Sequence, residues 1–274
     1  MWWKVALFLA LGYAALVGVV YLAQDSLVYF PNMGRAHVAT PAVHGLAYED
    51  VFLKTSDGET LHAWWLPVTD ARGTVLLFHG NAGNISHRME YARMFRTLGY
   101  HTLLVDYRGY GKSTGTPSEQ GTYADATAAW QWLTTTRGIP NREIVIFGES
   151  LGGAVACWLA RERPAGALII ASTFTSVPDL GSEVYGFLPV RLISRFSYDT
   201  RECLPHVKAP VLVIHSADDE IIPVAHGRRL FEAARKPKVF LELAGGHNDG
   251  FVFMRAEWVK ALGAFLTGAQ RSLF

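Results

Sequence analysis

The sequence predicts an α/β protein whose mixed, mostly parallel sheet has helices on both faces. From Gly73 onward, short apolar runs alternate with helical segments, which implies parallel strands joined by right-handed crossovers. A hairpin pattern precedes this alternation and adds an antiparallel beginning to the sheet. A Gly-x-Ser-x-Gly pentapeptide stands between an apolar run and an alanine-rich helix. The 274 residues suit one large domain or two small ones.

The first element is an apolar segment. No charged residue occurs from Val5 to Ala23, and this run covers roughly 28 Å as a helix, about one bilayer core. A cleaved signal peptide would have a small residue where Tyr21 stands, and a buried core helix would show a polar stripe. We therefore expect residues 1–24 to be an uncleaved membrane anchor. Lys4, the only positive charge before the run, favours a single-pass topology with a cytoplasmic N-terminus and the domain outside the cytoplasm.

A stretch of little periodicity, residues 25–45, is expected to link the anchor to the domain. The domain itself is expected over residues 46–274. It begins with a β-hairpin, because alternating apolar residues flank the turn Ser56–Gly58.

The alternating part of the chain predicts six strands and five helices. The strands are expected at Thr74–Phe78, His101–Asp106, Ile144–Phe147, Ala167–Ala171, Val211–His215 and Val239–Leu243. The helices are expected at Ser86–Leu98, Tyr123–Arg137, Leu151–Arg161, Val224–Ala234 and Phe251–Leu266. The interval 173–204 is long for a strand connection, so we expect either a short lid-like insertion or a crossover helix with long flanks.

Ser150 is the candidate nucleophile. Its pentapeptide Gly148–Gly152 follows the apolar run Ile144–Phe147 and opens a helix. A sharp strand-to-helix turn of this kind lifts the serine hydroxyl clear of the sheet. The alternative is an ordinary serine at a helix N-cap. As a nucleophile, the hydroxyl needs a base, usually histidine, and the histidine needs an orienting carboxylate.

Candidate partners follow two later strands, in the chain order serine, acid, histidine. His247 comes after a Gly-Gly pair, which permits close approach of the backbone, although a loop histidine without function is the alternative. Asp218, Asp219 and Glu220 all lie on the loop after the preceding strand. Turn formation explains any of the three equally well, so their positions alone do not select the acid.

Acyl transfer also generates an oxyanion, which two backbone N–H groups can stabilise. Leu151, the residue after the serine, supplies one candidate donor. Asn81, in the glycine-containing loop after the strand Thr74–Phe78, supplies the other. A glycine-rich turn or a phosphate cradle is the alternative for this loop, but the helix start lacks the lysine that a cradle requires.

Several classes of function are disfavoured. A net charge of +1 without a basic stripe gives no reason to expect nucleic-acid partners. We expect no metal and no cofactor, because the chain has no His-Glu-x-x-His motif and no Cys/His cluster. Gly109–Thr114 looks like the end of a nucleotide-binding loop, but Asp106 stands where that motif needs glycine.

Five stretches carry a resemblance to a known family: Phe78–Asn84, Asp106–Gly111, Gly148–Gly152, Asp219–Pro223 and Gly245–Asp249. With them the chain resembles the α/β-hydrolase superfamily over nearly all of residues 48–268. More narrowly, it resembles the membrane-anchored branch related to the yeast Bem-type hydrolases and the mammalian α/β-hydrolase-domain depalmitoylases. The resemblance implies the α/β-hydrolase fold, with Ser150 as nucleophile, His247 as base and Asp219 as orienting acid.

We therefore expect a serine hydrolase that cleaves carboxylic esters or thioesters through an acyl-enzyme. The expected substrates are small-molecule or lipid-like acyl compounds near a membrane. A peptidase or amidase with the same triad is one alternative, and a non-catalytic membrane-tethered binding domain is another. No cysteine cluster for palmitoylation accompanies the anchor, which weakens any transfer of depalmitoylase activity. The oligomeric state is left open by the sequence.

Overall fold

An eight-stranded sheet forms the centre of the protein, seen in a computed structural model that describes residues 1–248 and 255–271. The strand order is β1-β2-β4-β3-β5-β6-β7-β8. β2 pairs antiparallel with β1 and β4, and the remaining pairings are parallel, as the sequence predicts. The strands are β1 Glu49–Lys54, β2 Thr60–Leu66, β3 Gly73–Phe78, β4 Tyr100–Val105, β5 Ile144–Glu149, β6 Ala167–Ala171, β7 Val211–Ser216 and β8 Lys238–Leu243.

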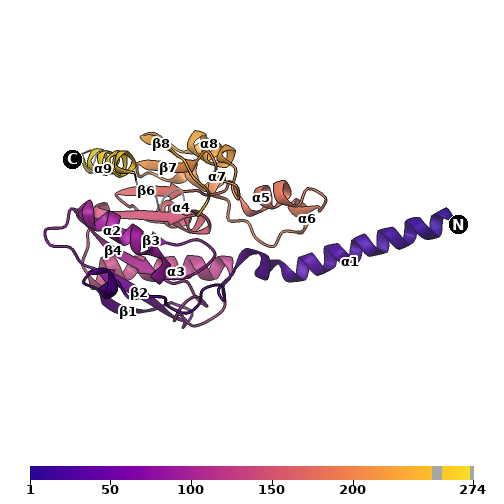
Figure 1. Cartoon of the computed structure of the whole chain (residues 1–274), viewed down its shortest axis with the longest axis horizontal. Helices are drawn as coiled ribbons and strands as arrows, with labels where there is room; N and C mark the ends of the chain where they lie inside the picture. Colours follow the sequence, from indigo (N-terminus) through magenta and orange to yellow (C-terminus); the bar gives the residue numbers. More distant parts are fainter. Residues whose placement is uncertain (249–254, 272–274) are drawn as a thin grey trace.

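Helices cover both faces of the sheet (Figure 1). Successive residues of β3 alternate between two apolar clusters: Val75 and Leu77 pack with α2 and α9, whereas Leu76 and Phe78 pack with α3 and α4. A strand buried on both faces needs this continuous apolar run. The helices are α1 Trp2–Val28, α2 Met89–Thr97, α3 Glu119–Gln131, α4 Leu151–Glu162, α5 Val177–Val184, α6 Val190–Ile193, α7 Thr200–Cys203, α8 Val224–Ala233 and α9 Ala256–Arg271.

Several helix boundaries differ from the sequence expectation; α2 begins at Met89 rather than Ser86, because Ile85–Arg88 form a 3-10 helix before it. α3 begins at Glu119, four residues before the expected Tyr123, because the Ser118 side chain caps it by accepting the N–H of Gly121. The last helix was expected from Phe251, a position outside the described residues, and the structure describes α9 from Ala256.

The N-terminal helix α1 projects from the domain as a long rod (Figure 1). It is long and apolar enough to cross a membrane, and none of its most apolar window is buried. The helix continues to Val28, so it runs four residues past the end expected for the anchor. Gln24 and Asp25 keep this last turn in place, because both contact the segment between β6 and β7.

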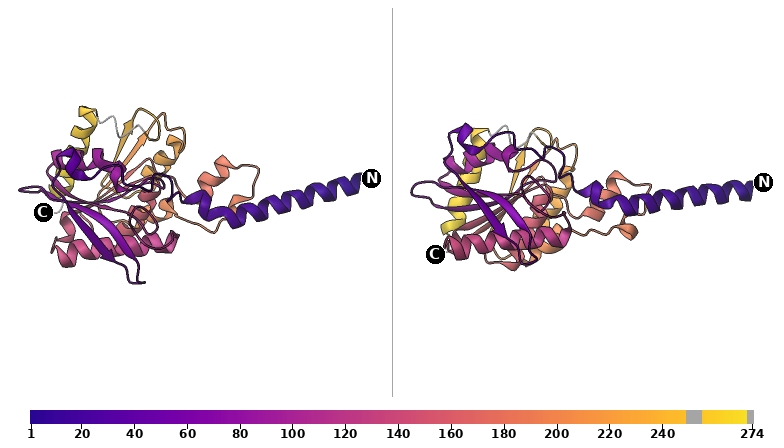
Figure 2. Two further views of the ribbon diagram at one scale, coloured as in Figure 1. Left: turned by 60° about the horizontal axis from the view of Figure 1, so that its bottom comes forward. Right: turned by 90° about the horizontal axis from the view of Figure 1, so that it is seen from below.

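The connection between β6 and β7 forms an insertion that contains the short helices α5, α6 and α7. α5 and α6 lie beside the inner part of α1, and the views in Figures 1 and 2 agree on this arrangement. The insertion follows the carboxyl end of β6 and lies alongside the end of α1 that joins the domain (Figure 1). The expectation of a single crossover helix with long flanks is not met.

Candidate active site

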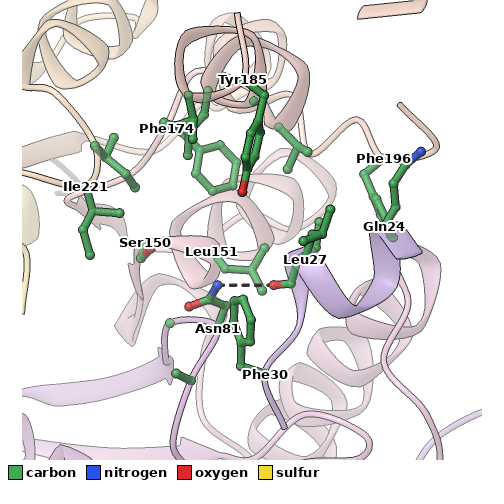
Figure 3. Close-up of a pocket in the computed structure, with 18 of the residues that line it drawn as sticks. Gln24, Leu27, Phe30, Asn81, Ser150, Leu151, Phe174, Tyr185, Phe196 and Ile221 are labelled. Carbon is green, nitrogen blue, oxygen red and sulfur yellow. Dashed lines mark hydrogen bonds between the residues drawn. The ribbon is translucent and has the colours of Figure 1, made fainter. Parts of the chain in front are cut away.

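Ser150 occupies a strained turn between β5 and α4. Its backbone has φ 53° and ψ −119°, a conformation that non-glycine residues seldom adopt. The Ser150 N–H is bonded to the carbonyl of Ala171, the last residue of the neighbouring strand, at 2.8 Å. The side chain therefore stands at the carboxyl edge of the sheet, at the N-terminus of the 12-residue helix α4. Figure 3 shows Ser150 at the edge of a pocket.

Two glycines make this turn possible. A Cβ atom added at Gly148 would lie 2.1 Å from the carbonyl oxygen of Gly152, and one added at Gly152 would lie 2.2 Å from the carbonyl oxygen of Phe78. Both positions therefore exclude any larger residue. The pentapeptide needs glycine at both positions because the backbones of β3, β5 and α4 approach one another this closely.

His247 lies between the serine and an acid. Its Nε2 is 3.2 Å from Ser150 Oγ, and its Nδ1 is 2.8 Å from Asp219 Oδ2. Since a carboxylate oxygen only accepts, Nδ1 carries the hydrogen in this contact and Nε2 of the neutral ring is free to accept the serine proton. The structure thus brings Ser150, Asp219 and His247 together from three separate loops.

Each of the three candidate acids has a different contact. Asp219 Oδ2 faces the His247 ring, and its Oδ1 accepts the N–H groups of Ile221 and Ile222 at 3.0 and 2.8 Å. Asp218 Oδ2 accepts the N–H of Gly245 at 3.3 Å. Glu220 Oε2 accepts the backbone N–H of His247 at 2.9 Å. Only Asp219 contacts the imidazole, and its two neighbours hold the histidine loop.

The electrostatics favour an ionised Asp219. Burial raises its pKa, but the side chains of His215 and His247 and the Ile222 N–H lower it more, so the pKa lies well below its usual range. His215 is completely buried and bonds through Nε2 to the Ile222 carbonyl at 2.8 Å. A permanent negative charge therefore faces the Nδ1 side of His247.

The loop after β3 brings Asn81 beside the serine. The Gly80 carbonyl faces the ring nitrogen Nδ1 of His79 at 2.7 Å, and in a trans peptide the following Asn81 N–H points the opposite way. A Cβ added at Gly80 would lie 3.5 Å from Ser150 Cβ, so this peptide runs directly past the serine. The Asn81 carbonyl accepts the Phe30 N–H at 3.0 Å and the Tyr110 hydroxyl at 2.9 Å.

A cavity of about 480 Å³ begins at the serine. In Figure 3 Leu27 and Phe30 border it on the side of α1, and Phe174 and Tyr185 border it on the side of the insertion. Its walls are mainly aliphatic and aromatic, whereas Arg88 and Glu149, whose Nε and Oε2 atoms are 3.3 Å apart, form a charged pair in the lining. The site thus joins a polar end at Ser150 to an apolar chamber.

One group of described residues could offer ligands to a metal ion. His37, His62 and Asp106 each have one ligand atom within 4.8 Å of the others, and His62 Nε2 is held by Asp50 Oδ1 at 2.6 Å. The cluster is separate from the Ser150–His247 contact. Asp106 Oδ1 also accepts the N–H of Ile85, which follows the loop that carries Asn81, at 2.9 Å.

Some residues of the site were not singled out from the sequence. Glu220 was considered only as an alternative acid, and His215 ends an apolar strand as a core histidine would. Gln24 was placed at the end of the anchor, yet it lines the cavity. Its polarity at the end of an apolar run was the one available signal.

The fold and the site define the class of protein: the chain belongs to the α/β-hydrolase family. A model described as "alpha/beta hydrolase fold" matches residues 73–190. The chain is 38% identical to the alpha/beta hydrolase domain-containing protein WAV2 of Arabidopsis thaliana, over 89% of this chain and 88% of that protein.

Two further relatives have names that refer to a membrane or to a lipid. The uncharacterized membrane protein YNL320W of Saccharomyces cerevisiae is 32% identical over 92% of this chain and 94% of its own length. The lysophosphatidylserine lipase ABHD12 of Danio rerio is 35% identical over 65% of this chain and 50% of its own length. With the apolar helix α1, the yeast relative fits a single-pass membrane protein.

Solved structures agree with the fold. The Pyrococcus furiosus esterase Pf2001 superposes with a TM-score of 0.72 at 21% identity, covering 85% of this chain and 96% of that one. The family and the named lipase relative indicate a hydrolase.

Proposed function

We propose that the protein is a serine hydrolase that cleaves carboxylic esters or thioesters through an acyl-enzyme. The observation that carries this proposal is the position of His247, with Nε2 at 3.2 Å from Ser150 Oγ and Nδ1 at 2.8 Å from Asp219 Oδ2, at the end of an apolar cavity. The same geometry is required for a histidine to take a serine proton while a carboxylate holds its tautomer.

The reaction runs in two halves. Ser150 Oγ attacks the acyl carbon as His247 Nε2 takes its proton, and His247 then returns the proton to the leaving alkoxide or thiolate. Water, deprotonated by the same histidine, hydrolyses the acyl-enzyme and releases Ser150. The N–H groups of Leu151 and Asn81 stabilise the oxyanion formed in each half. Asp219 stays ionised throughout and stabilises the transient imidazolium.

The cavity supports an acyl chain as the group bound next to Ser150. Its aliphatic and aromatic lining gives no match for a peptide backbone, which needs several hydrogen-bond partners. The lipase activity named for ABHD12 supports a lipid-like substrate here as well. The topology follows the charge of Lys4, with the N-terminus in the cytoplasm and the domain on the other side.

The test is hydrolysis of p-nitrophenyl esters of increasing chain length, with aminoacyl anilides beside them. We expect the rate to rise from the acetyl to the medium-chain esters and the anilides to react far more slowly. Ser150→Ala should remove activity, whereas Ser56→Ala, at an exposed turn residue of the β1–β2 hairpin, should not change it. A wild type no faster than Ser150→Ala on every ester, or faster on the anilides, refutes the esterase proposal.

A further inference from the structure

The insertion and the N-terminal helix form one unit. The side chain of Gln24, which is 7% exposed, donates from Nε2 to the Ile193 carbonyl at 2.8 Å and accepts the Arg195 N–H at 2.7 Å. Asp25 adds an ion pair to the Arg195 guanidinium at 2.6 Å. A buried amide with both ends bonded fixes the orientation of the two partners. α1 is therefore packed against the insertion and is no free tether.

The contact continues outward along α1. The Tyr13 hydroxyl donates to the Phe187 carbonyl at 2.9 Å, and Tyr13 lies eleven residues before Gln24, about 16 Å along the helix axis. The chain carries no charge from Val5 to Gln24, which is about the 20 residues that cross a hydrocarbon core. If α1 spans the bilayer, Phe187 lies inside the leaflet next to the domain. There the Phe187 carbonyl satisfies a tyrosine hydroxyl that has no water to bond.

The outer surface of the insertion is apolar, as a surface inside a lipid leaflet must be. Large apolar side chains are exposed from the end of α5 through α6, with Val184 56%, Phe187 65% and Leu192 88% exposed. The charged residues at this tip are compensated: Glu183 pairs with Arg229, and Arg191 pairs with Asp179. An exposed apolar cluster of this kind marks an interaction surface.

We propose that the tip of the insertion, Val184–Ile193, is inserted in the lipid bilayer beside α1, and that the cavity receives its acyl substrate from that leaflet. Continuity with the spanning helix identifies the bilayer as the occupant of this apolar surface. Val20 and Leu27 of α1 and Leu180 and Leu188 of the insertion face the same cavity that begins at Ser150. An acyl chain can thus pass between the two elements without crossing water. The route to the serine rests on the proposed function; the position of the tip does not.

The position is tested by fluorescence quenching on the full chain in phosphatidylcholine vesicles. Leu192→Cys carries an environment-sensitive dye, and Asn141→Cys, an exposed residue at the opposite edge of the sheet, is the control. The native Cys157 and Cys203 are buried and should not react. We expect lipids brominated on their acyl chains to quench the dye at residue 192 at least threefold more than the dye at residue 141. Equal quenching at the two positions overturns the proposal.

The route is tested with matched substitutions. Phe187→Asp should lower hydrolysis of a long-chain ester held in vesicles at least tenfold and leave hydrolysis of a water-soluble butyrate ester unchanged. Phe52→Asp, at a 59% exposed position on the edge strand β1, should alter neither rate. An unchanged vesicle rate for Phe187→Asp, or an equal fall in both rates, contradicts entry from the bilayer. If the dye is quenched but no ester is cleaved, the proposed function fails while the inserted tip stands.

Discussion

The side-chain amide of Asn81 donates a hydrogen bond to the carbonyl of Val28, the last residue of α1, with an N···O distance of 3.3 Å (Figure 3). The residue proposed to stabilise the oxyanion is thus tied to the end of the N-terminal helix. A second tie joins the Phe30 N–H to the Asn81 carbonyl. Two hydrogen bonds of Asn81 therefore connect its loop to the end of α1 and to the segment directly after it.

Replacing Asn81 tests the hydrogen bond between its side chain and Val28 separately from the proposed oxyanion hole. Asn81→Ala keeps the backbone N–H proposed for the oxyanion hole but loses the bond to Val28. We expect kcat on a butyrate ester to fall about fivefold, the equivalent of one ordinary hydrogen bond of about 1 kcal/mol. If kcat of Asn81→Ala instead falls as far as that of Ser150→Ala, the Asn81 side chain itself takes part in the reaction.

Asp219 should be required for the correct histidine tautomer. Asp219→Asn places an amide donor where His247 Nδ1 needs an acceptor, so kcat should fall about 10³- to 10⁴-fold. Asp218→Asn is the matched control, and because the Asp218 carboxylate accepts the Gly245 N–H and is not bonded to the His247 ring, this change should cost less than about threefold. Steady-state kinetics with a soluble ester measures both, and equal effects would contradict the assignment.

The pH dependence of stability follows from the same carboxylate. Because its folded-state pKa is lowered, Asp219 contributes stability at pH values above its unfolded pKa, about 3.9, and loses it as the pH falls through the folded-state value. Wild type should therefore lose more thermal stability than Asp219→Asn between pH 6 and pH 3. Parallel curves of Tm against pH would show that the contacts of Asp219 do not stabilise its charge.

Glu220 should act as a positioning residue. It accepts the backbone N–H of His247 and touches neither the serine nor the substrate cavity. Glu220→Ala should lower kcat about tenfold, through loss of a charge-assisted bond of about 1.5 kcal/mol. Glu220→Gln, which retains an acceptor oxygen, should restore most of the rate with KM unchanged. A glutamine variant as slow as the alanine variant would contradict the positioning role.

The glycine at the end of the pentapeptide should be important for stability. Gly152→Ala puts a Cβ on α4 at 2.2 Å from the carbonyl oxygen of Phe78, the last residue of β3. We expect a cost of about 3 kcal/mol, which lowers Tm by about 6–12 °C in a domain of this size. Gly268→Ala on α9 meets nothing within 4 Å and should leave Tm unchanged or slightly raised. Equal Tm values for the two variants would contradict the close approach.

The central strands were predictable because each is a short apolar run, and β6 coincides with its expected range, Ala167–Ala171. The loops that carry Ser150, Asp219 and His247 were predictable for a related reason: they follow those strands, and parallel strands end at one edge of the sheet. Short apolar runs in the sequence were therefore sufficient to predict both the strands and the loops that follow them.

Contacts between distant segments were not predictable. Gln24 contacts Ile193 across 169 residues, and no local pattern indicates that the end of an apolar helix lines the cavity at Ser150. The role of Glu220 depends on a backbone N–H 27 residues away, which composition does not reveal. Both arise from tertiary packing around the insertion.

The central claim is that Ser150 is an activated nucleophile, and a fluorophosphonate probe tests it most directly. Such a probe phosphonylates a serine that a neighbouring histidine deprotonates. After reaction of the full chain in vesicles, peptide mass mapping should find the adduct on Ser150, and His247→Ala should slow its formation at least a hundredfold. Absence of labelling, or labelling of Ser150→Ala to the same extent as wild type, would contradict the account.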